Sequence, residues 1–253
     1  MSKGTVSVPS IASEKDNDII HGGDGNDTIY GQKGNDQLFG ENGDDYLSGG
    51  KGDDLLYGGL GHNTIKGDSG NDIIFAQGGD DTISGGTGFD TLDFSLSNRG
   101  LTIDVSKGSA LGFNTSAFSS IEKIVGSAYA DDYKGSSGAD VFIGGAGDDM
   151  IRGLGGADVL TGGSGRDTFV YMGKDAGAVD HITDFAAGDR LDLHDFLKST
   201  KYASIGDVVH VNDGAAGSTV SVKTSAGFVD LVVLDGVHGT TAQDLLSHGM
   251  ILA

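Results

Sequence analysis

Aspartate recurs at every ninth residue through two stretches of the chain, with asparagine once in its place. The residues are Asp18, Asp27, Asp36, Asp45, Asp54, Asn63, Asp72, Asp81 and Asp90, then Asp131, Asp140, Asp149, Asp158 and Asp167. Carboxylates and backbone carbonyls are hard oxygen donors, which suit a cation such as Ca²⁺ that takes about six to eight oxygens. Zn²⁺ and Cu²⁺ favour His or Cys, but Cys is absent and the repeats carry only His21 and His62. The pattern predicts a row of hard-cation sites, weaker at Asn63.

These residues occupy position 6 of a nine-residue repeat, of which residues 22–30, 31–39 and 40–48 are successive copies. Glycines at positions 1, 2 and 4 suit a turn with left-handed or closely approached backbone. Positions 7 to 9 alternate as a short strand does. A turn and a strand repeated without interruption predict an all-β solenoid whose core forms only when neighbouring copies stack.

Position 8 is apolar in every copy and is expected to fill that core. These residues are Ile20, Ile29, Leu38, Leu47, Leu56, Ile65, Ile74, Ile83 and Leu92 in the first stretch, and Tyr133, Phe142, Ile151, Leu160 and Phe169 in the second.

The repeat resembles the RTX (repeats-in-toxin) nonapeptide of bacterial type I secreted proteins. The resemblance implies a right-handed parallel β-roll with two copies per turn, in which stacked turns chelate Ca²⁺ through position-6 carboxylates and backbone carbonyls. Asp27 should then face Asp45, and Asp36 should face Asp54. The expected carbonyl donors lie at position 4, on Gly25, Gly34, Gly43, Gly52, Gly61, Gly70, Gly79, Gly88, Gly138, Gly147, Gly156 and Gly165.

The formal net charge of −21 bears on partners and on stability. It argues against nucleic acid, and roughly ten Ca²⁺ would nearly neutralise it. Without metal, stacked aspartates repel and the glycine-rich backbone is costly to order, so an unfolded chain is expected. No apolar run of about 18 residues occurs, so no membrane span is predicted.

The chain divides into five segments by pattern. Residues 1–12 read as a lead-in or an expression remnant, 13–93 as the first RTX β-roll block and 126–170 as the second. Residues 94–125 form a non-repeat insertion or cap, with strands expected at 101–105 and 121–125. The loop between them carries Phe113 and Phe118, which are expected to seal the roll. A ligand-binding insertion is the alternative.

Residues 171–253 are predicted to be a β-rich cap with the type I secretion signal region. Residues 179–197 resemble the segment that closes RTX rolls, and its Asp180, Asp184, Asp189 and Asp192 either flank a further Ca²⁺ site or serve as cap and turn residues. Strands are expected at 207–212, 218–223 and 228–234. A short helix with a threonine cap is expected at 240–248.

Sequence signatures of catalysis are missing: there is no zinc-protease, nucleophile-elbow or phosphate-loop motif, and no enzyme is predicted. The resemblance implies an extracellular or cell-surface protein of a Gram-negative bacterium, with an adhesin C-terminus as the main interpretation. It would cross a type I ABC transporter unfolded in low-calcium cytosol, and fold on Ca²⁺ outside. The alternatives are a noncatalytic module of a secreted alginate epimerase, protease or lipase, and a surface protein that binds an extracellular glycan.

Overall fold

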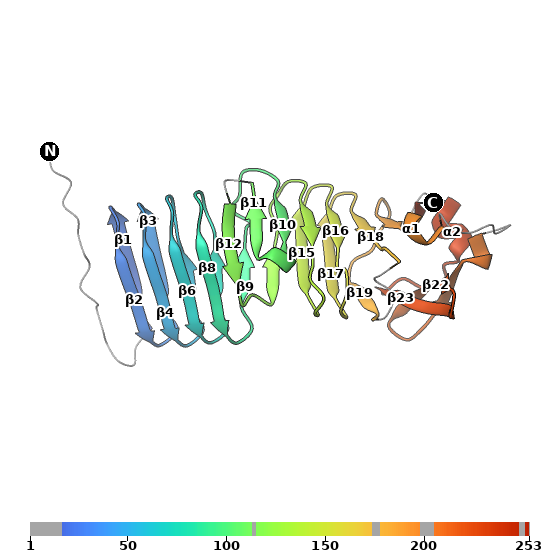
Figure 1. The fold of residues 1–253 in the computed structure, drawn as a ribbon, viewed down its shortest axis with the longest axis horizontal. Helices are drawn as coiled ribbons and strands as arrows, with labels where there is room; N and C mark the ends of the chain where they lie inside the picture. The colour runs from blue at the N-terminus through green and yellow to red at the C-terminus, as the bar shows by residue number, and fades with distance from the viewer. Residues whose placement is uncertain (1–16, 113–114, 174–177, 198–204, 248–250, 253) are drawn as a thin grey trace. The chain divides into compact units, whose positions relative to one another are not determined.

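The computed structural model describes residues 17–112, 115–173, 178–197, 205–247 and 251–252 (Figure 1). The chain forms two compact units. The first comprises the described residues of Met1–Thr102 and Lys107–Ala128, and the second those of Ile103–Ser106 and Tyr129–Ala253. Each unit contains stacked parallel strands, which confirms the predicted β-solenoid.

Two sheets of the first unit receive strands alternately along the chain. One sheet contains β1 (Ile19–Asp24), β3 (Gln37–Asn42), β5 (Leu55–Tyr57), β7 (Ile73–Phe75), β9 (Thr91–Asp93) and β13 (Lys123–Val125). The other contains β2 (Thr28–Lys33), β4 (Tyr46–Lys51), β6 (Thr64–Ser69), β8 (Thr82–Thr87), β12 (Thr115–Ser119) and β11 (Ser109–Leu111). Ile19 pairs with Gln37 and Thr28 with Tyr46. Two copies therefore complete one turn, as expected.

The core of both units runs along position 8. All fourteen of these side chains are buried, from Ile20 at 5 % exposure to Leu38 and Phe169 at 0 %. Residues on either side of position 8 point outward because side chains alternate along a strand. The predicted interior is confirmed.

Aromatic rings stack on the outward face of the first unit at position 9. Ring centroids are 4.6 Å apart between His21 and Phe39, 4.7 Å between Phe39 and Tyr57, and 4.4 Å between Tyr57 and Phe75. These spacings match the separation of neighbouring strands. The stack therefore supports the same register as the buried core.

The prediction of a loop between the two strands of residues 94–125 is wrong in part. Strands β10 (Thr102–Asp104) and β13 were expected, but β11 and β12 also form, paired antiparallel to each other. β12 then continues the sheet beyond β8, with Phe118 opposite Ile83 and 7 % exposed. Phe118 thus extends the core beyond Ile83, whereas Phe113 lies outside the described residues. Sheet extension replaced the loop because β8 otherwise presents an unpaired edge.

The second unit continues with the same alternation. One sheet contains β15 (Val141–Ala146), β17 (Val159–Ser164), β19 (Asp180–Ile182), β23 (Gly227–Asp235), β22 (Gly217–Thr224) and β21 (Val209–Asp213). The other contains β10, which mostly belongs to this unit, then β14 (Asp132–Lys134), β16 (Met150–Arg152), β18 (Thr168–Val170), β20 (Arg190–Asp192) and β24 (Ile251–Leu252).

Two short helices accompany the second unit's strands, and neither is long and apolar enough to cross a membrane. They are α1 (His194–Leu197), which was not predicted, and α2 (Ala242–Ser247). The hydroxyl of Thr241 accepts the Asp244 backbone N–H at 3.1 Å, which confirms the predicted threonine cap of α2. The predicted His248 lies outside the described residues.

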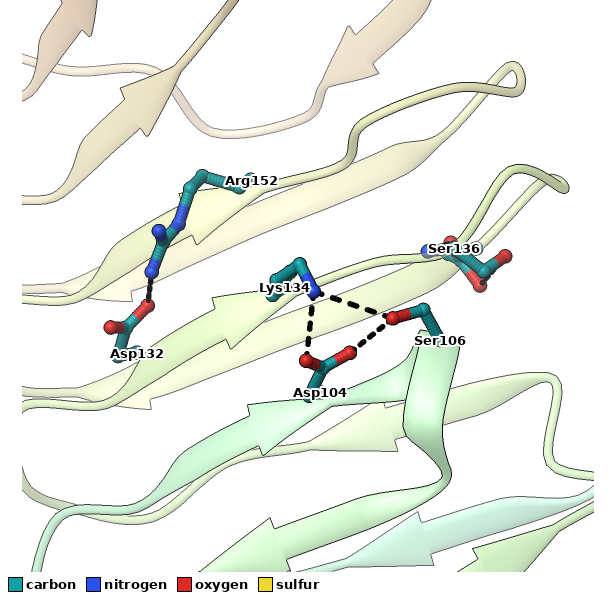
Figure 2. A network of polar contacts seen from close by, with 7 residues as sticks. Asp104, Ser106, Asp132, Lys134, Ser136 and Arg152 are labelled. Atoms are coloured by element: carbon teal, nitrogen blue, oxygen red, sulfur yellow. Dashed lines mark hydrogen bonds and ion pairs between the residues drawn. The ribbon is translucent and has the colours of Figure 1, made fainter.

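Charged side chains pair on the outward face of β10, β14 and β16 (Figure 2). Lys134 Nζ lies 2.8 Å from Asp104 Oδ2 and donates to Ser106 Oγ at 3.3 Å. Arg152 pairs with Asp132. These pairs lie near the surface, where an ion pair contributes only about 0–1 kcal/mol.

Candidate metal centre

A ladder of hydrogen bonds joins the position-6 residues of stacked copies. The backbone N–H of Asp27 donates to Asp45 Oδ1, and that of Asp36 donates to Asp54 Oδ1, both at 2.8 Å. The same bond, at 2.7–3.0 Å, joins Asp18–Asp36, Asp45–Asn63, Asp54–Asp72, Asn63–Asp81, Asp72–Asp90, Asp131–Asp149, Asp140–Asp158 and Asp149–Asp167. The sequence-predicted residues thus meet in columns at 18-residue spacing.

The second carboxylate oxygen has no such partner. Oδ2 is buried and makes no hydrogen bond in Asp18, Asp27, Asp36, Asp45, Asp54, Asp72, Asp90, Asp149 and Asp167. Asp54 as a whole is only 2 % exposed, and Asp72 and Asp90 are 0 % exposed. A buried carboxylate oxygen without a donor or a cation is strongly destabilising. These columns therefore need positive charge.

Backbone carbonyls converge on the same oxygens beside the position-1 glycines. A Cβ built on Gly31 would lie closer than 3.0 Å to both Asp36 Oδ2 and the Gly49 carbonyl oxygen. The same holds at Gly67, where Asp72 Oδ2 and the Gly85 carbonyl share the space. In the second unit, Gly144 has Asp149 Oδ2 and the Gly162 carbonyl as its neighbours. At these three positions a side chain would fill the space that these oxygens surround, whereas Ala76 stands at position 1 in the copy that holds Asp81.

The carbonyls beside Oδ2 therefore belong to position 1, whereas the predicted carbonyl donors belong to the position-4 glycines. Most have positive φ, as at Gly34 and Gly52, both with φ 123°. A Cβ on Gly52 would collide with the Gly34 carbonyl oxygen, so these carbonyls lie against the stacked turn. Gly138 differs, since its φ is not positive and its N–H donates to Ser136 Oγ at 3.0 Å. The prediction named only position-4 carbonyls, because residue spacing does not reveal the direction in which a carbonyl points.

Burial shifts the acid–base behaviour of the columns. It raises the pKa of Asp54 and Asp149 to about 7, with neighbouring aspartates adding repulsion. Burial likewise raises the pKa of Asp72 and Asp81 to about 6. The pKa is raised by burial also in Asp36, Asp45, Asp90, Asp140 and Asp167. Burial therefore makes ionised aspartates in these columns unfavourable unless a cation compensates their charge.

Asn63 and Asp140 are among the predicted position-6 residues that depart from the pattern. Asn63 has its Nδ2 where the others have Oδ2, and no carbonyl is among the atoms closest to its position-1 glycine, Gly58. Asp140 Oδ2 accepts the Ser136 backbone N–H at 2.7 Å. Both carry fewer available oxygens than the regular sites. The expected weakness at Asn63 has a physical basis here.

The columns continue into residues outside the repeat. Asp158 N–H donates to Asp180 Oδ1 at 2.9 Å, and Asp167 N–H to Asp189 Oδ1 at 3.0 Å. Asp184 accepts the N–H groups of Gly162 and Gly163 at 2.9 and 2.7 Å. Asp180 and Asp189 thus occupy the place of position 6 at a spacing of 22 residues, while Asp184 serves a turn.

Backbone oxygens are essential to any cation site of this kind. Within the part of the chain that the structure describes, no three His, Cys, Asp or Glu side chains gather as a metal cluster. A carboxylate oxygen together with carbonyl oxygens is a donor set for a hard cation such as Ca²⁺. The residues present therefore fit calcium and do not fit zinc.

The model of the RTX calcium-binding nonapeptide repeat (four copies) matches residues 13–47, 33–65, 57–92 and 134–169. This chain carries RTX calcium-binding repeats. The matches cover copies in both units, including the columns of Asp54 and Asp149 described above.

Solved structures similar to this chain include parts of two enzymes. The AlgE6R3 subunit of the Azotobacter vinelandii mannuronan C5-epimerase is 25 % identical, over 49 % of this chain and 78 % of that one, with a TM-score of 0.20. The extracellular lipase LipA of Serratia marcescens is 17 % identical over 96 % of this chain, with a TM-score of 0.28. This chain spans 40 % of the lipase chain. No curated protein matches the sequence.

Proposed function

We propose that this chain is a noncatalytic region of a secreted bacterial protein, and that it folds when Ca²⁺ binds outside the cell. The observation that carries the proposal is the row of buried Oδ2 atoms without hydrogen-bond partners, most of which lie beside a backbone carbonyl. A cation between stacked turns would compensate these oxygens. Its binding free energy would then also be folding free energy.

The ligands in this proposal are the position-6 side chains together with turn carbonyls. The carbonyls at position 1, such as those of Gly49 and Gly85, join the position-4 carbonyls expected from the sequence. Roughly ten Ca²⁺ would bring about twenty positive charges to a chain with net charge −21. Neutralisation of this size supports multiple ions instead of one.

The difference between low cytosolic and high external Ca²⁺ concentrations would make the chain fold only after export. In the cytosol, ionised columns would repel and leave the chain unfolded, which suits threading through a type I ABC transporter. Outside a Gram-negative cell, millimolar Ca²⁺ is sufficient for weak extracellular sites. Within this proposal the parent is a surface adhesin. Secretion of the parent protein at an unchanged rate in external chelator would contradict the folding-assisted step.

Far-UV circular dichroism during a Ca²⁺ titration tests the central claim, with Mg²⁺ as the control. A cooperative coil-to-β transition with Ca²⁺ is expected. Mg²⁺ should not produce it, because Mg²⁺ demands near-octahedral geometry and gives up water reluctantly. A chain fully folded in chelator at pH 8 would refute calcium-driven folding.

A further inference from the structure

Asp90 is the last repeat residue of its column in the first unit. It is 0 % exposed, and its Oδ1 accepts the Asp72 N–H at 2.8 Å. Its Oδ2 is buried and makes no hydrogen bond. The repeat stops at Asp93, so no further copy follows in register to supply the oxygens that complete the sites below it.

Two non-repeat residues stand where that further copy would be. The Asp90 N–H donates to Glu122 Oε2 at 2.8 Å, as Asp72 N–H donates to the Asp90 carboxylate. Lys123 follows Glu122 and donates its N–H to the Asp90 carbonyl at 3.0 Å, as Thr91 does to the Asp72 carbonyl at 2.8 Å. Glu122 thus takes the place of a position-6 residue immediately before β13.

The carbonyl of Ser120 completes the resemblance to a regular site. A Cβ on Gly85 would lie closer than 3.0 Å to both Asp90 Oδ2 and the Ser120 carbonyl oxygen. At Gly67 the equivalent pair is Asp72 Oδ2 and the Gly85 carbonyl. Ser120 has φ +52°, an unusual conformation for a residue with a side chain. This conformation lets a turn of only Ser120–Ile121–Glu122 replace the longer repeat turn.

We propose that Asp90 Oδ2, the Ser120 carbonyl and the carboxylate charge of Glu122 form a calcium site outside the nonapeptide pattern. The site rests on the proposed function, since it uses the same cation. Glutamate is one methylene longer than aspartate, so it reaches Asp90 across the shortened turn. Calcium here fastens the segment before β13 to the end of the repeat column, and closes the first unit.

The experiment is hydrogen–deuterium exchange of the full chain across a Ca²⁺ titration at pH 8. Two regions are compared: residues 117–125, next to the proposed site, and residues 46–57, inside the repeats. The variants are Asp90→Asn and Glu122→Gln, which remove one charge each. The matched control is Asp53→Asn, which removes one charge at an exposed position 5. Asn35 occupies the equivalent place in another copy and accepts the Asp53 N–H, so asparagine is compatible with this ladder.

In the wild type, Ca²⁺ is expected to protect both regions. In Asp90→Asn and Glu122→Gln, protection of 117–125 should require on the order of tenfold more Ca²⁺, while 46–57 follows the Asp53→Asn control. If both variants protect 117–125 at the control's midpoint, the site is refuted. If Asp90→Asn also loses protection of 46–57, the test rests on Glu122→Gln, which leaves every repeat residue intact. The site is then refuted if Glu122→Gln protects 117–125 at the control's midpoint. Failure of Ca²⁺ to protect either region in the wild type would instead refute the proposed function.

Discussion

Asp54→Asn is predicted to change stability in opposite directions with and without calcium. Asp54 Oδ1 accepts the Asp36 N–H at 2.8 Å, and asparagine can keep this bond, as Asn63 does for Asp45 at 3.0 Å. The substitution replaces the buried, unpartnered Oδ2 with an amide nitrogen. It therefore removes one charge and one cation ligand while it preserves the ladder.

The magnitude in calcium follows from ligand linkage. A site at a free Ca²⁺ concentration of about one hundred times its Kd contributes about 2.7 kcal/mol to the free energy of unfolding. Loss of the Asp54 ligand should remove most of this. If the site is abolished, the Ca²⁺-loaded fold is destabilised by roughly 2–3 kcal/mol.

The sign reverses in the metal-free fold. Burial raises the pKa of Asp54 from 3.8 to about 7, so the folded state holds a proton that the unfolded state has released. This contribution is fully present below pH 3.8 and is lost as the pH rises through 7. At pH 8 the ionised carboxylate opposes folding. Asparagine does not ionise, so it should stabilise the metal-free fold by roughly 1–3 kcal/mol.

Urea unfolding followed by far-UV circular dichroism measures both effects at pH 8. One series uses excess Ca²⁺, and the other uses chelator with sucrose, which favours the compact state. Asp53→Asn is the control, since it changes the same charge at an exposed neighbour whose Oδ1 accepts the Asn71 N–H at 2.7 Å. Changes of the same sign in both series, or an equal effect of the control, would refute the reasoning.

Three further outcomes are expected. Asn63→Asp should raise Ca²⁺-loaded stability by less than Asp54→Asn lowers it, because no carbonyl is among the atoms closest to Gly58; equal and opposite changes in urea midpoint would contradict this. In chelator, the chain should gain β-sheet dichroism as the pH falls from about 8 to about 5, since burial raises the pKa of Asp54, Asp149, Asp72 and Asp81 to about 6–7 and protonation then favours the fold. A signal that does not change with pH would count against buried, ionisable columns. Gly52→Ala should lower the Ca²⁺-loaded stability by more than about 2 kcal/mol, because its Cβ would collide with the Gly34 carbonyl. Gly25→Ala should cost only about 1 kcal/mol, because Gly25 has φ 125° but no atom within 4 Å of the added Cβ. Thermal unfolding compares the two variants, and similar losses of stability would contradict the steric argument.

Much of the site was predictable from the repeat, and the remainder depended on atom directions. Position-6 spacing identified the columns, as the Asp27–Asp45 and Asp36–Asp54 bonds show. Which oxygen is bonded and which is left over follows from side-chain rotation inside the stacked turns. The position-1 carbonyls met the unbonded Oδ2 atoms only once the turns were stacked. No residue-type pattern encodes that direction, since every residue carries a carbonyl.

The sequence by itself determined the solenoid, its core and the column of carboxylates. Because the nine-residue period is strict and two copies form one turn, residues that are 18 apart in the sequence lie side by side in the fold. Ile19 and Gln37 are such a pair. Only the tertiary structure decided how the columns end. Glu122 lies 32 residues beyond Asp90, and Asp189 lies 22 beyond Asp167. These partners fall outside the period because sheet pairing of β13 and β20 places them, and pairing between distant segments is fixed by the packed fold.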